Sequence, residues 1–306
     1  MPSFQDICEA IQEASDLGLA TEPNEILTGY SGEQLTGTLQ RLSQLCLTDD
    51  TCYLEVGVYQ GLTLLSVASA VPERSVYGID NFAFFDAEGK NFGIVKERRE
   101  KLGATNAEVI NLDYEDALAD LSAHLGGKKV GVYFVDGPHD YRSQLVCLLL
   151  IKPFLAPGAV IIVDDCNYRH VRQANNDFLM SHPEFKLIFQ AYTSSHPKNM
   201  NPGAYQQATM GWWNGANVIV HDPDNELEPF LPPTYRSRKL YENEHEVHAS
   251  KFPGLVPAVL PALINQGPTL ATQLNLPADQ IGRFPAMNTF SEDLTRHQFH
   301  PAFSEF

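Results

Sequence analysis

The spacing of polar and apolar residues changes once near residue 50. Residues 3–17 and 31–46 repeat apolar side chains with helical spacing, and Ser31 is a candidate N-cap for the second helix. After that, short apolar runs alternate with helix-length segments. The runs are CYLEVGV, SVYGID, AEVINLD, VGVYFVD and AVIIVDD. This alternation predicts βαβ units, in which apolar strands form a parallel sheet with helices on both faces.

Beyond the fifth run, the pattern predicts one more helix, over residues 168–181, and two more strands. These strands are FKLIFQAYT and GWWNGANVIVH, the second starting with Trp212 and Trp213, and a polar loop over residues 194–209 joins them. The fold class we expect is therefore α/β, a Rossmann-like sheet of seven mostly parallel strands with helices on both faces.

The last part of the chain has a different composition. Eleven of the 20 prolines follow residue 221, and little helical or strand periodicity remains there. We expect three parts: an N-terminal helical cap over 1–47, a core over 48–221, and a proline-rich extension over 222–306. The apolar positions of the extension predict that it packs on the core or on a partner subunit, which would give a homo-oligomer.

Composition narrows the function classes. A net charge of −17 argues against nucleic acid as a partner, because such binding needs a basic face that displaces counterions from phosphates. No apolar run is long enough to span a membrane, and the N-terminus lacks the layout of a signal peptide. The five cysteines contain no CxxC pair, so reduced thiols are favoured over disulfides or zinc. We expect a soluble, cytoplasmic protein with no membrane partner.

A glycine-rich turn follows the first predicted strand. In YLEVGVYQGLTLLSVA, Gly57 would allow a tight turn close to a ligand, and Gly61 would allow close packing of helix and strand. Asp80 ends the second strand, where an acid can bind both hydroxyls of a ribose. The spacing is G-x-x-x-G and Tyr59 would crowd a pyrophosphate, so a ligand that ends in an amino acid, such as S-adenosylmethionine (SAM), fits better than NAD.

The segments LEVGVYQG, GIDNF, INLDYEDAL, VYFVDGPHDY and LAPGAVIIVDD together resemble the class I SAM-dependent methyltransferases. The closest branch is that of the metal-dependent small-molecule O-methyltransferases of the macrolide-sugar and catechol type. The resemblance covers roughly residues 50–220 and implies SAM as the cofactor. By position, the cofactor-binding residues it implies are Glu55, Gly57, Tyr59, Gly61, Asp80, Asn81 and Asp113.

A second group of polar residues follows the fourth and fifth strands. Asp136 ends one strand, and Asp164 with Asp165 ends the next. Because neighbouring parallel strands end at one edge of a sheet, these carboxylates should converge, and Mg²⁺ or another hard divalent cation would relieve their repulsion. His139 follows Asp136 by three residues and is the candidate general base. The alternative is that the acids are turn and helix caps and that His139 bonds to backbone.

Together these features predict methyl transfer from SAM to a hydroxyl of a small molecule, either a sugar, a polyol or a phenolic metabolite. Asp136 and His139 are the expected catalytic residues, and Asp136, Asp164 and Asp165 the expected metal ligands. An aliphatic hydroxyl is about nine pKa units from ionising at neutral pH, more than a base alone supplies, so a metal is most useful for a sugar-like acceptor. An NAD(P)-dependent oxidoreductase and a non-catalytic nucleotide-binding protein stay open as alternatives.

Overall fold

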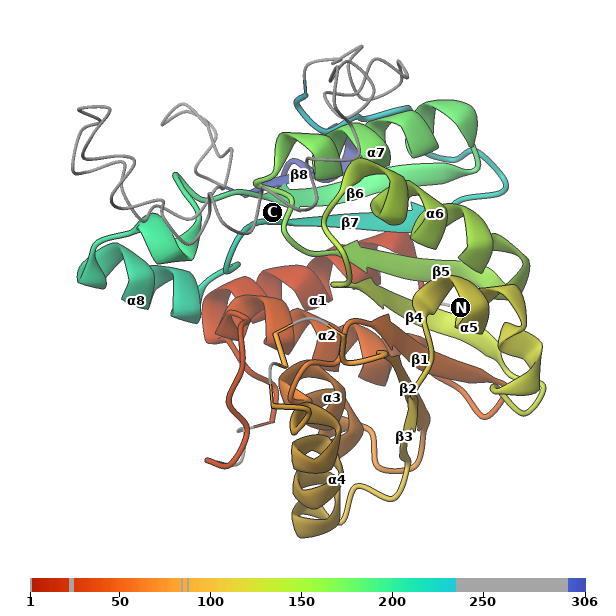
Figure 1. Cartoon of the computed structure of the whole chain (residues 1–306). Helices are drawn as coiled ribbons and strands as arrows, with labels where there is room; N and C mark the ends of the chain where they lie inside the picture. Colours follow the sequence, from red (N-terminus) through yellow and green to blue (C-terminus); the bar gives the residue numbers. More distant parts are fainter. Residues whose placement is uncertain (1, 22–24, 84, 87, 235–296) are drawn as a thin grey trace, which may run out of the picture. The chain divides into compact units, whose positions relative to one another are not determined.

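The structure, a computed structural model, describes residues 2–21, 25–83, 85–86, 88–234 and 297–306, which all belong to one compact unit. Its centre is a sheet with the strand order β3-β2-β1-β4-β5-β7-β6-β8 (Figure 1). The strands are β1 Thr51–Val56, β2 Ser75–Ile79, β3 Ala107–Ile110, β4 Lys129–Val135, β5 Leu155–Val163, β6 Phe185–Ala191, β7 Ala216–His221 and β8 Gln298–Phe299. The first five pair in parallel, and β7 runs antiparallel to both β5 and β6.

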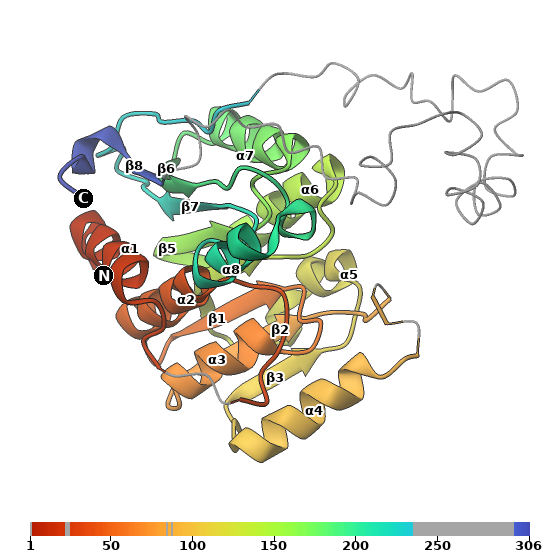
Figure 2. The same ribbon diagram turned by 90° about the vertical axis from the view of Figure 1, so that its left-hand side faces the viewer.

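Helices cover both faces of the sheet, as the apolar strands predict. The helices are α1 Phe4–Leu17, α2 Glu33–Cys46, α3 Leu62–Ala70, α4 Asn91–Leu102, α5 Tyr114–Ala119, α6 Tyr141–Ile151, α7 Arg169–Ser181 and α8 Pro202–Met210. α2, α3 and α4 lie on one face and α5, α6 and α7 on the other, while α1 packs against α2 (Figure 2). Strands β4 and β5 are buried along most of their length, which explains why their sequences do not alternate. The Rossmann-like α/β fold is confirmed.

The expected N-cap of α2 is wrong by one residue. The cap is Gly32, and no side chain caps this helix. Instead, the backbone carbonyl of Gly211 accepts the N–H groups of Gln34 and Leu35, at 3.2 and 3.4 Å. A Cβ at position 32 would lie 2.0 Å from that same carbonyl oxygen, so only glycine fits the contact. The start of α2 is thereby tied to the end of α8.

Two elements differ from the expected pattern. The polar stretch 194–209 was expected to be a loop but contains α8, which Asn201 caps through its side chain and in which Pro202 holds the first position. The last expected strand starts later, at Ala216, because Trp213 has a left-handed backbone with φ +51° that ends any extended run.

The sheet has eight strands, not the seven expected. The additional strand β8 pairs antiparallel with β6, with Phe299 opposite Phe189. Phe299 is buried in the same hydrophobic core as Phe189. Residues 235–296 of the expected extension lie outside the described residues. The domain boundaries at 47 and 221 and the homo-oligomer therefore stay predictions.

Two further expectations about the chain can be compared with the structure. All five cysteines are free thiols, and four of them are buried. Among the described helices, none has both the length and the hydrophobicity that crossing a lipid bilayer requires.

Candidate functional site

Backbone strain gathers at one edge of the sheet, where the parallel strands end. Six non-glycine residues of the described chain have positive φ angles. Five of them flank this edge: Tyr59 after β1, Phe82 and Phe85 after β2, Asp165 after β5, and Trp213 before β7. Bulky residues rarely adopt this conformation, and where they do they cluster at functional sites. The predicted site residues lie at the same edge.

The glycine turn after β1 contacts the end of β4. Gly57 has φ +96°, and a Cβ there would lie 2.0 Å from the carbonyl oxygen of Asp136. Asp136 in turn donates its N–H to the carbonyl of Val56 at 2.9 Å. Gly61 has φ +81° and immediately precedes α3. The close approach that requires Gly57 is thus to the neighbouring strand, so the two sequence motifs form one continuous surface.

Three of the expected cofactor residues lie where the loops after β2 and β3 meet. One carboxylate oxygen of Asp80 accepts the N–H groups of Val58 and Tyr59, at 2.9 and 2.8 Å. The other oxygen accepts the N–H of Phe82 at 2.7 Å. The side chain of Asn81 donates to Asp113 at 3.2 Å.

Asp113 also accepts the N–H of Glu115 and is the N-cap of α5. Asp80 and Asp113 therefore have local structural roles, as a brace of the glycine turn and as a helix cap. A carboxylate has about four lone-pair sites, so both retain capacity for a ligand.

Glu55 is fully buried beneath the turn. The Tyr53 hydroxyl donates to one of its oxygens at 2.7 Å and the Thr63 hydroxyl to the other at 3.2 Å. Burial raises the pKa of Glu55 to about 8, although the two hydroxyl donors act in the opposite direction. Both oxygens of this expected cofactor residue are engaged inside the protein.

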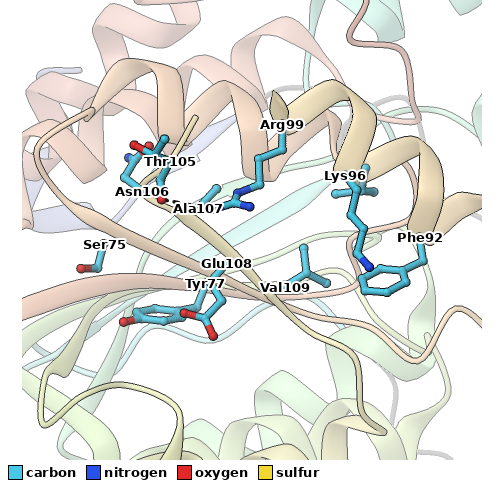
Figure 3. Close-up of a pocket in the computed structure, with 11 residues that line it drawn as sticks. Ser75, Tyr77, Phe92, Lys96, Arg99, Thr105, Asn106, Ala107, Glu108 and Val109 are labelled. Carbon is cyan, nitrogen blue, oxygen red and sulfur yellow. Dashed lines mark hydrogen bonds between the residues drawn. The ribbon is translucent and has the colours of Figure 1, made fainter. Parts of the chain in front are cut away.

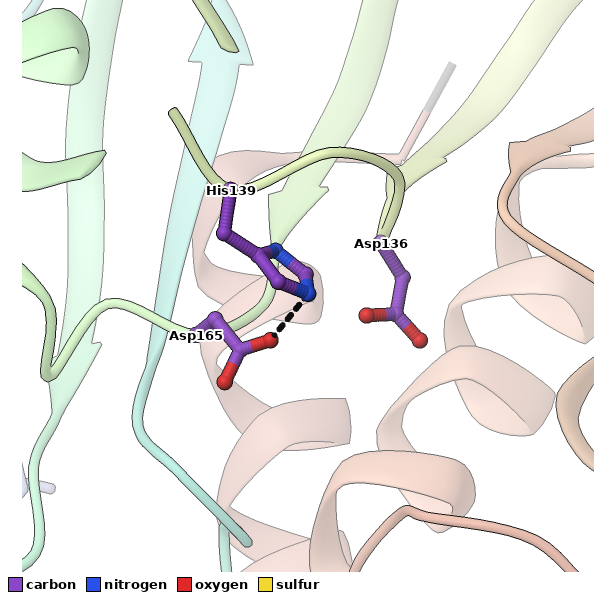
Figure 4. A group of neighbouring side chains, drawn as sticks. All are labelled: Asp136, His139 and Asp165. Atoms are coloured by element: carbon purple, nitrogen blue, oxygen red, sulfur yellow. Dashed lines mark ion pairs between the residues drawn. The ribbon is translucent and has the colours of Figure 1, made fainter. Parts of the chain in front are cut away.

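The second predicted group converges around an imidazole. Ligand atoms of Asp136, His139 and Asp165 all lie within 4.8 Å of one another. His139 Nε2 is 2.7 Å from Asp165 Oδ2, and the Asp136 carboxylate lies beside the same nitrogen (Figure 4). The side chain of His139 is 32% exposed, so a ligand can reach the ring.

The pKa values of the three side chains in this group shift for different reasons. Burial raises the pKa of Asp136 well above its ordinary range, and the neighbouring Asp164 and Asp165 raise it further. Burial alone would raise the pKa of Asp165, but pairing with His139 and a hydrogen bond from Asn214 lower it. Burial lowers the pKa of His139, but the charge of Asp165, the hydrogen bond to it and the charge of Asp140 together outweigh burial and raise the pKa. Asp165 thus pairs with the imidazole, whereas burial and neighbouring acids oppose the charge of Asp136.

Asp164 lies next to this group but is not part of it. Its side chain is buried, and one oxygen accepts the N–H of Asp165 at 2.7 Å. The other oxygen, Oδ2, has no hydrogen-bond partner among the described residues. Burial, and after it the charge of Asp165, raises the pKa of Asp164 well above its ordinary range. A buried carboxylate oxygen without a donor is costly, and a bound cation or a proton would satisfy it.

These residues fit a divalent cation. Two carboxylates and an imidazole would suit Mn²⁺ and related transition metals, whereas the set of Asp136, Asp164 and Asp165 expected from the sequence offers oxygen alone, as Mg²⁺ prefers. The unpartnered oxygen of Asp164 and the raised pKa values favour positive charge at this point in either case.

Several residues at this edge carried no sequence motif. Tyr30, from the segment before α2, stacks on Tyr59 with ring centroids 5.4 Å apart and on Trp213 at 6.1 Å. Tyr205 of α8 meets Trp213 edge-on at 5.7 Å, and the Lys198 ammonium lies 4.9 Å from the Tyr30 ring. They come from segments far apart in the sequence, so no local pattern could have revealed this aromatic group.

A separate open pocket of about 400 Å³ lies near the edge strand β3. It is lined by α4, β2 and β3 (Figure 3). Lys96 lies over the Phe92 ring at 3.9 Å, and Arg99 donates to the backbone carbonyls of Ala104 and Thr105. Its cationic side chains therefore have local roles, and none of the predicted site residues lines it.

The central region resembles a family of known proteins. Residues 54–166 match the model of a family described as a methyltransferase domain. Over these residues the chain is similar to that family. The match begins in β1 and ends directly after Asp165, so the matched region contains both the glycine turn and the acidic group. The match bears out the methyltransferase resemblance expected from the sequence.

Solved structures resemble the chain more distantly. An O-methyltransferase from Bacillus cereus in complex with S-adenosylhomocysteine (SAH) is 16% identical with a TM-score of 0.46, over 72% of this chain and 92% of that one. The O-methyltransferase TomG from Streptomyces achromogenes, in complex with SAM, is 16% identical with a TM-score of 0.48, over 72% and 99%. No curated protein matches the chain. Similarities of this size carry no argument about function.

Proposed function

We propose that the protein transfers a methyl group from SAM to a hydroxyl of a small molecule, with a divalent cation assisting. The observation that carries the proposal is the position of Asp136. In a methyltransferase domain, it lies against the glycine turn on one side and beside His139 and Asp165 on the other. A methyl donor held at the turn would therefore lie next to a group that can bind and deprotonate an acceptor.

The cofactor site we propose comprises the residues of the turn and the two loops beside it. Gly57, Tyr59 and Gly61 would border the methionine part, Asp80 and Asn81 the ribose, and Asp113 the adenine. Glu55 would act from beneath, because its oxygens are bound by Tyr53 and Thr63. The left-handed backbone at Tyr59 supports this proposal, since it directs the chain around the end of β1.

In the transfer, the acceptor oxygen would form the new C–O bond as the S–C bond of the sulfonium breaks, releasing SAH. The acceptor proton would pass to His139, the candidate base. Asp136, Asp164 and Asp165 would hold the cation. When bound, a divalent cation would lower the pKa of the acceptor hydroxyl.

The aromatic group over the site supports an acceptor with a flat or apolar face. Tyr30, Tyr59 and Trp213 stack together, and Tyr30 is still 46% exposed. A phenolic ring or the apolar face of a sugar could pack on these rings. Tyr30 belongs to the N-terminal segment, which we propose excludes water from the reaction.

A metal-free reaction is a second candidate, and the 2.7 Å pair of His139 and Asp165 favours it. A histidine oriented by an aspartate can act as a base without a cation, and that would suffice for a phenol, whose pKa is about 10.

The experiment that tests the proposal measures transfer of labelled methyl from SAM to a panel of catechols, simple phenols and sugars. We expect activity that a chelator removes and that Mg²⁺ or Mn²⁺ restores, and a loss of about 10³-fold in the Asp136→Asn variant. Asp222→Asn is the matched control, because Asp222 is also buried but lies beyond β7 at the opposite edge of the sheet. Activity unaffected by the chelator would select the metal-free reaction. Absence of transfer to every acceptor tested would contradict the proposal.

A further inference from the structure

Asp165 lies at the end of a chain of side-chain hydrogen bonds that the sequence did not reveal. The backbone N–H of Thr193 donates to Asn167 Oδ1 at 3.0 Å, and Asn167 Nδ2 donates to Asn214 Oδ1 at 3.0 Å. Asn214 Nδ2 then donates to Asp165 Oδ1, and Asp165 Oδ2 pairs with His139 Nε2 at 2.7 Å. The chain thus runs from the loop after β6 to the candidate base.

The direction of this chain is fixed at its first member. A backbone N–H can only donate, so the oxygen of Asn167 must face Thr193 and its amide nitrogen must face Asn214. The Asn214 oxygen accepts that bond, so its amide nitrogen is the atom that faces Asp165. Asp165 therefore uses Oδ1 to accept from an amide, and its Oδ2 is directed at the imidazole.

Backbone bonds and burial hold the chain in place. Asn167 and Asn214 are both fully buried, and the Asn167 N–H donates to the Asn214 carbonyl at 2.9 Å. The N–H of Cys166 donates to the Gly215 carbonyl at 3.0 Å. These contacts clamp the loop after β5 to the turn before β7, and Asp165 keeps its left-handed backbone, with φ +56°, within that clamp.

We propose that Asn167 and Asn214 are positioning residues that orient the Asp165 carboxylate and fix neutral His139 as the Nε2–H tautomer. Nδ1 is then the only ring nitrogen of neutral His139 that can accept a proton. The role in deprotonation rests on the proposed function, whereas the tautomer is a property of the free protein. A histidine tautomer is set by the bond that its other nitrogen makes, which is here the bond to Asp165.

The test is ¹⁵N NMR of histidine-labelled, chelator-treated full-length protein, at a pH where His139 is neutral and with His139→Gln to assign its signals. We expect a protonated Nε2 and an unprotonated Nδ1. Asn167→Asp keeps an acceptor for Thr193 but places a second oxygen against Asn214, which forces that amide to turn its oxygen towards Asp165. We expect this variant, and Asn214→Leu, to lose the single tautomer.

Asn175→Asp is the matched control. Asn175 is also fully buried, and its amide donates to Asn217 at 3.0 Å and to Cys166 Sγ at 3.5 Å, neither of which belongs to the side-chain bonds that end at Asp165. We expect it to keep the tautomer of the unchanged protein whatever its melting temperature. An Nδ1–H tautomer in the unchanged protein, or identical spectra for Asn167→Asp and Asn175→Asp, would overturn the proposal.

Kinetics then separate this proposal from the proposed function. If the protein methylates an acceptor, Asn167→Asp should lower kcat about 10–100-fold with little change in the KM for SAM. A merely structural defect would instead change both parameters together. If no acceptor is methylated but the Nε2–H tautomer is found, the proposed function fails and the positioning of His139 stands.

Discussion

The proposed ligand site lies at the edge of the sheet where the parallel strands end, and it has a β1–β2 half and a β4–β5 half. The carboxylates of the two halves differ in their hydrogen-bond partners. On the β1–β2 side, each oxygen of Glu55 and of Asp80 accepts a donor from the protein itself. On the β4–β5 side, Asp164 Oδ2 has no donor among the described residues, and Asp136 lies in a group whose imidazole, that of His139, pairs with Asp165. Both halves contain buried acids, and both were identified from sequence motifs.

The difference teaches how each half can bind. The β1–β2 half is satisfied internally, so it can hold the uncharged nucleoside part of a ligand by shape and spare lone pairs without needing a counter-charge. The β4–β5 half keeps an electrostatic deficit that a cation or a proton would remove. Uncompensated carboxylates at the ends of two buried strands support a functional over a structural interpretation of these acids.

The pH dependence of stability tests the β1–β2 half. The pKa of Glu55 is raised to about 8 from an ordinary 4.5, so the unfolded chain releases this proton at lower pH than the folded one. The free energy of unfolding should therefore fall as pH rises from about 4.5 to 8, by up to about 5 kcal/mol from this group, and level off above. Urea unfolding across this range should show a smaller fall for Glu55→Gln. The exposed Glu108→Gln variant should follow the unchanged protein.

The β4–β5 half should instead respond in kinetics. His139→Gln removes the only imidazole of the acidic group and should lower kcat by about 10²–10⁴-fold in the methyl-transfer assay. SAH affinity by calorimetry should change little, since the cofactor is proposed to bind at the other half. His124→Gln, away from this edge, should leave both quantities unchanged. Loss of SAH binding in His139→Gln would show that the two halves are not separable.

Gly57 follows β1 and lies against the end of β4, so Gly57→Ala should disturb the structure of both halves. The new Cβ would lie 2.0 Å from the Asp136 carbonyl at a φ of +96°, so we expect a loss of about 3 kcal/mol in the free energy of unfolding. The control is Gly93→Ala in α4, where no atom lies within 4 Å of the new Cβ. That variant should gain about 0.5–1 kcal/mol in chemical denaturation. Equal stability of the two variants would contradict the close contact.

The smallest effect is expected at the aromatic group. Tyr30→Ala removes the stacking of the Tyr30 ring on Tyr59 and Trp213. Such a contact contributes about 0.5–1.5 kcal/mol for each aromatic pair. We expect the KM for the acceptor to rise about 3–10-fold, with Tyr30→Phe close to the unchanged protein. A fall in kcat with an unchanged KM would move Tyr30 from acceptor binding to the chemical step.

Much of this architecture can be predicted from the sequence. Period and composition predicted the parallel strands β1 to β5, because a strand buried on both faces must be apolar throughout. The same argument brought Asp136 and Asp165 together, since parallel strands end at a common edge. The helix α8 and the strand β8 were missed, because one is a short capped helix in polar sequence and the other is two residues long.

What the sequence determined by itself was the sheet, its ligand edge and the residue types at that edge, all of which follow from local periodicity and chain direction. Only the tertiary structure decided which oxygens have partners. It put His139 rather than Asp164 among the converging ligands, enclosed Glu55 with Tyr53 and Thr63, and joined Asn167 and Asn214 to Asp165. Hydrogen-bond direction and burial depend on side chains from distant segments, and no local pattern encodes them.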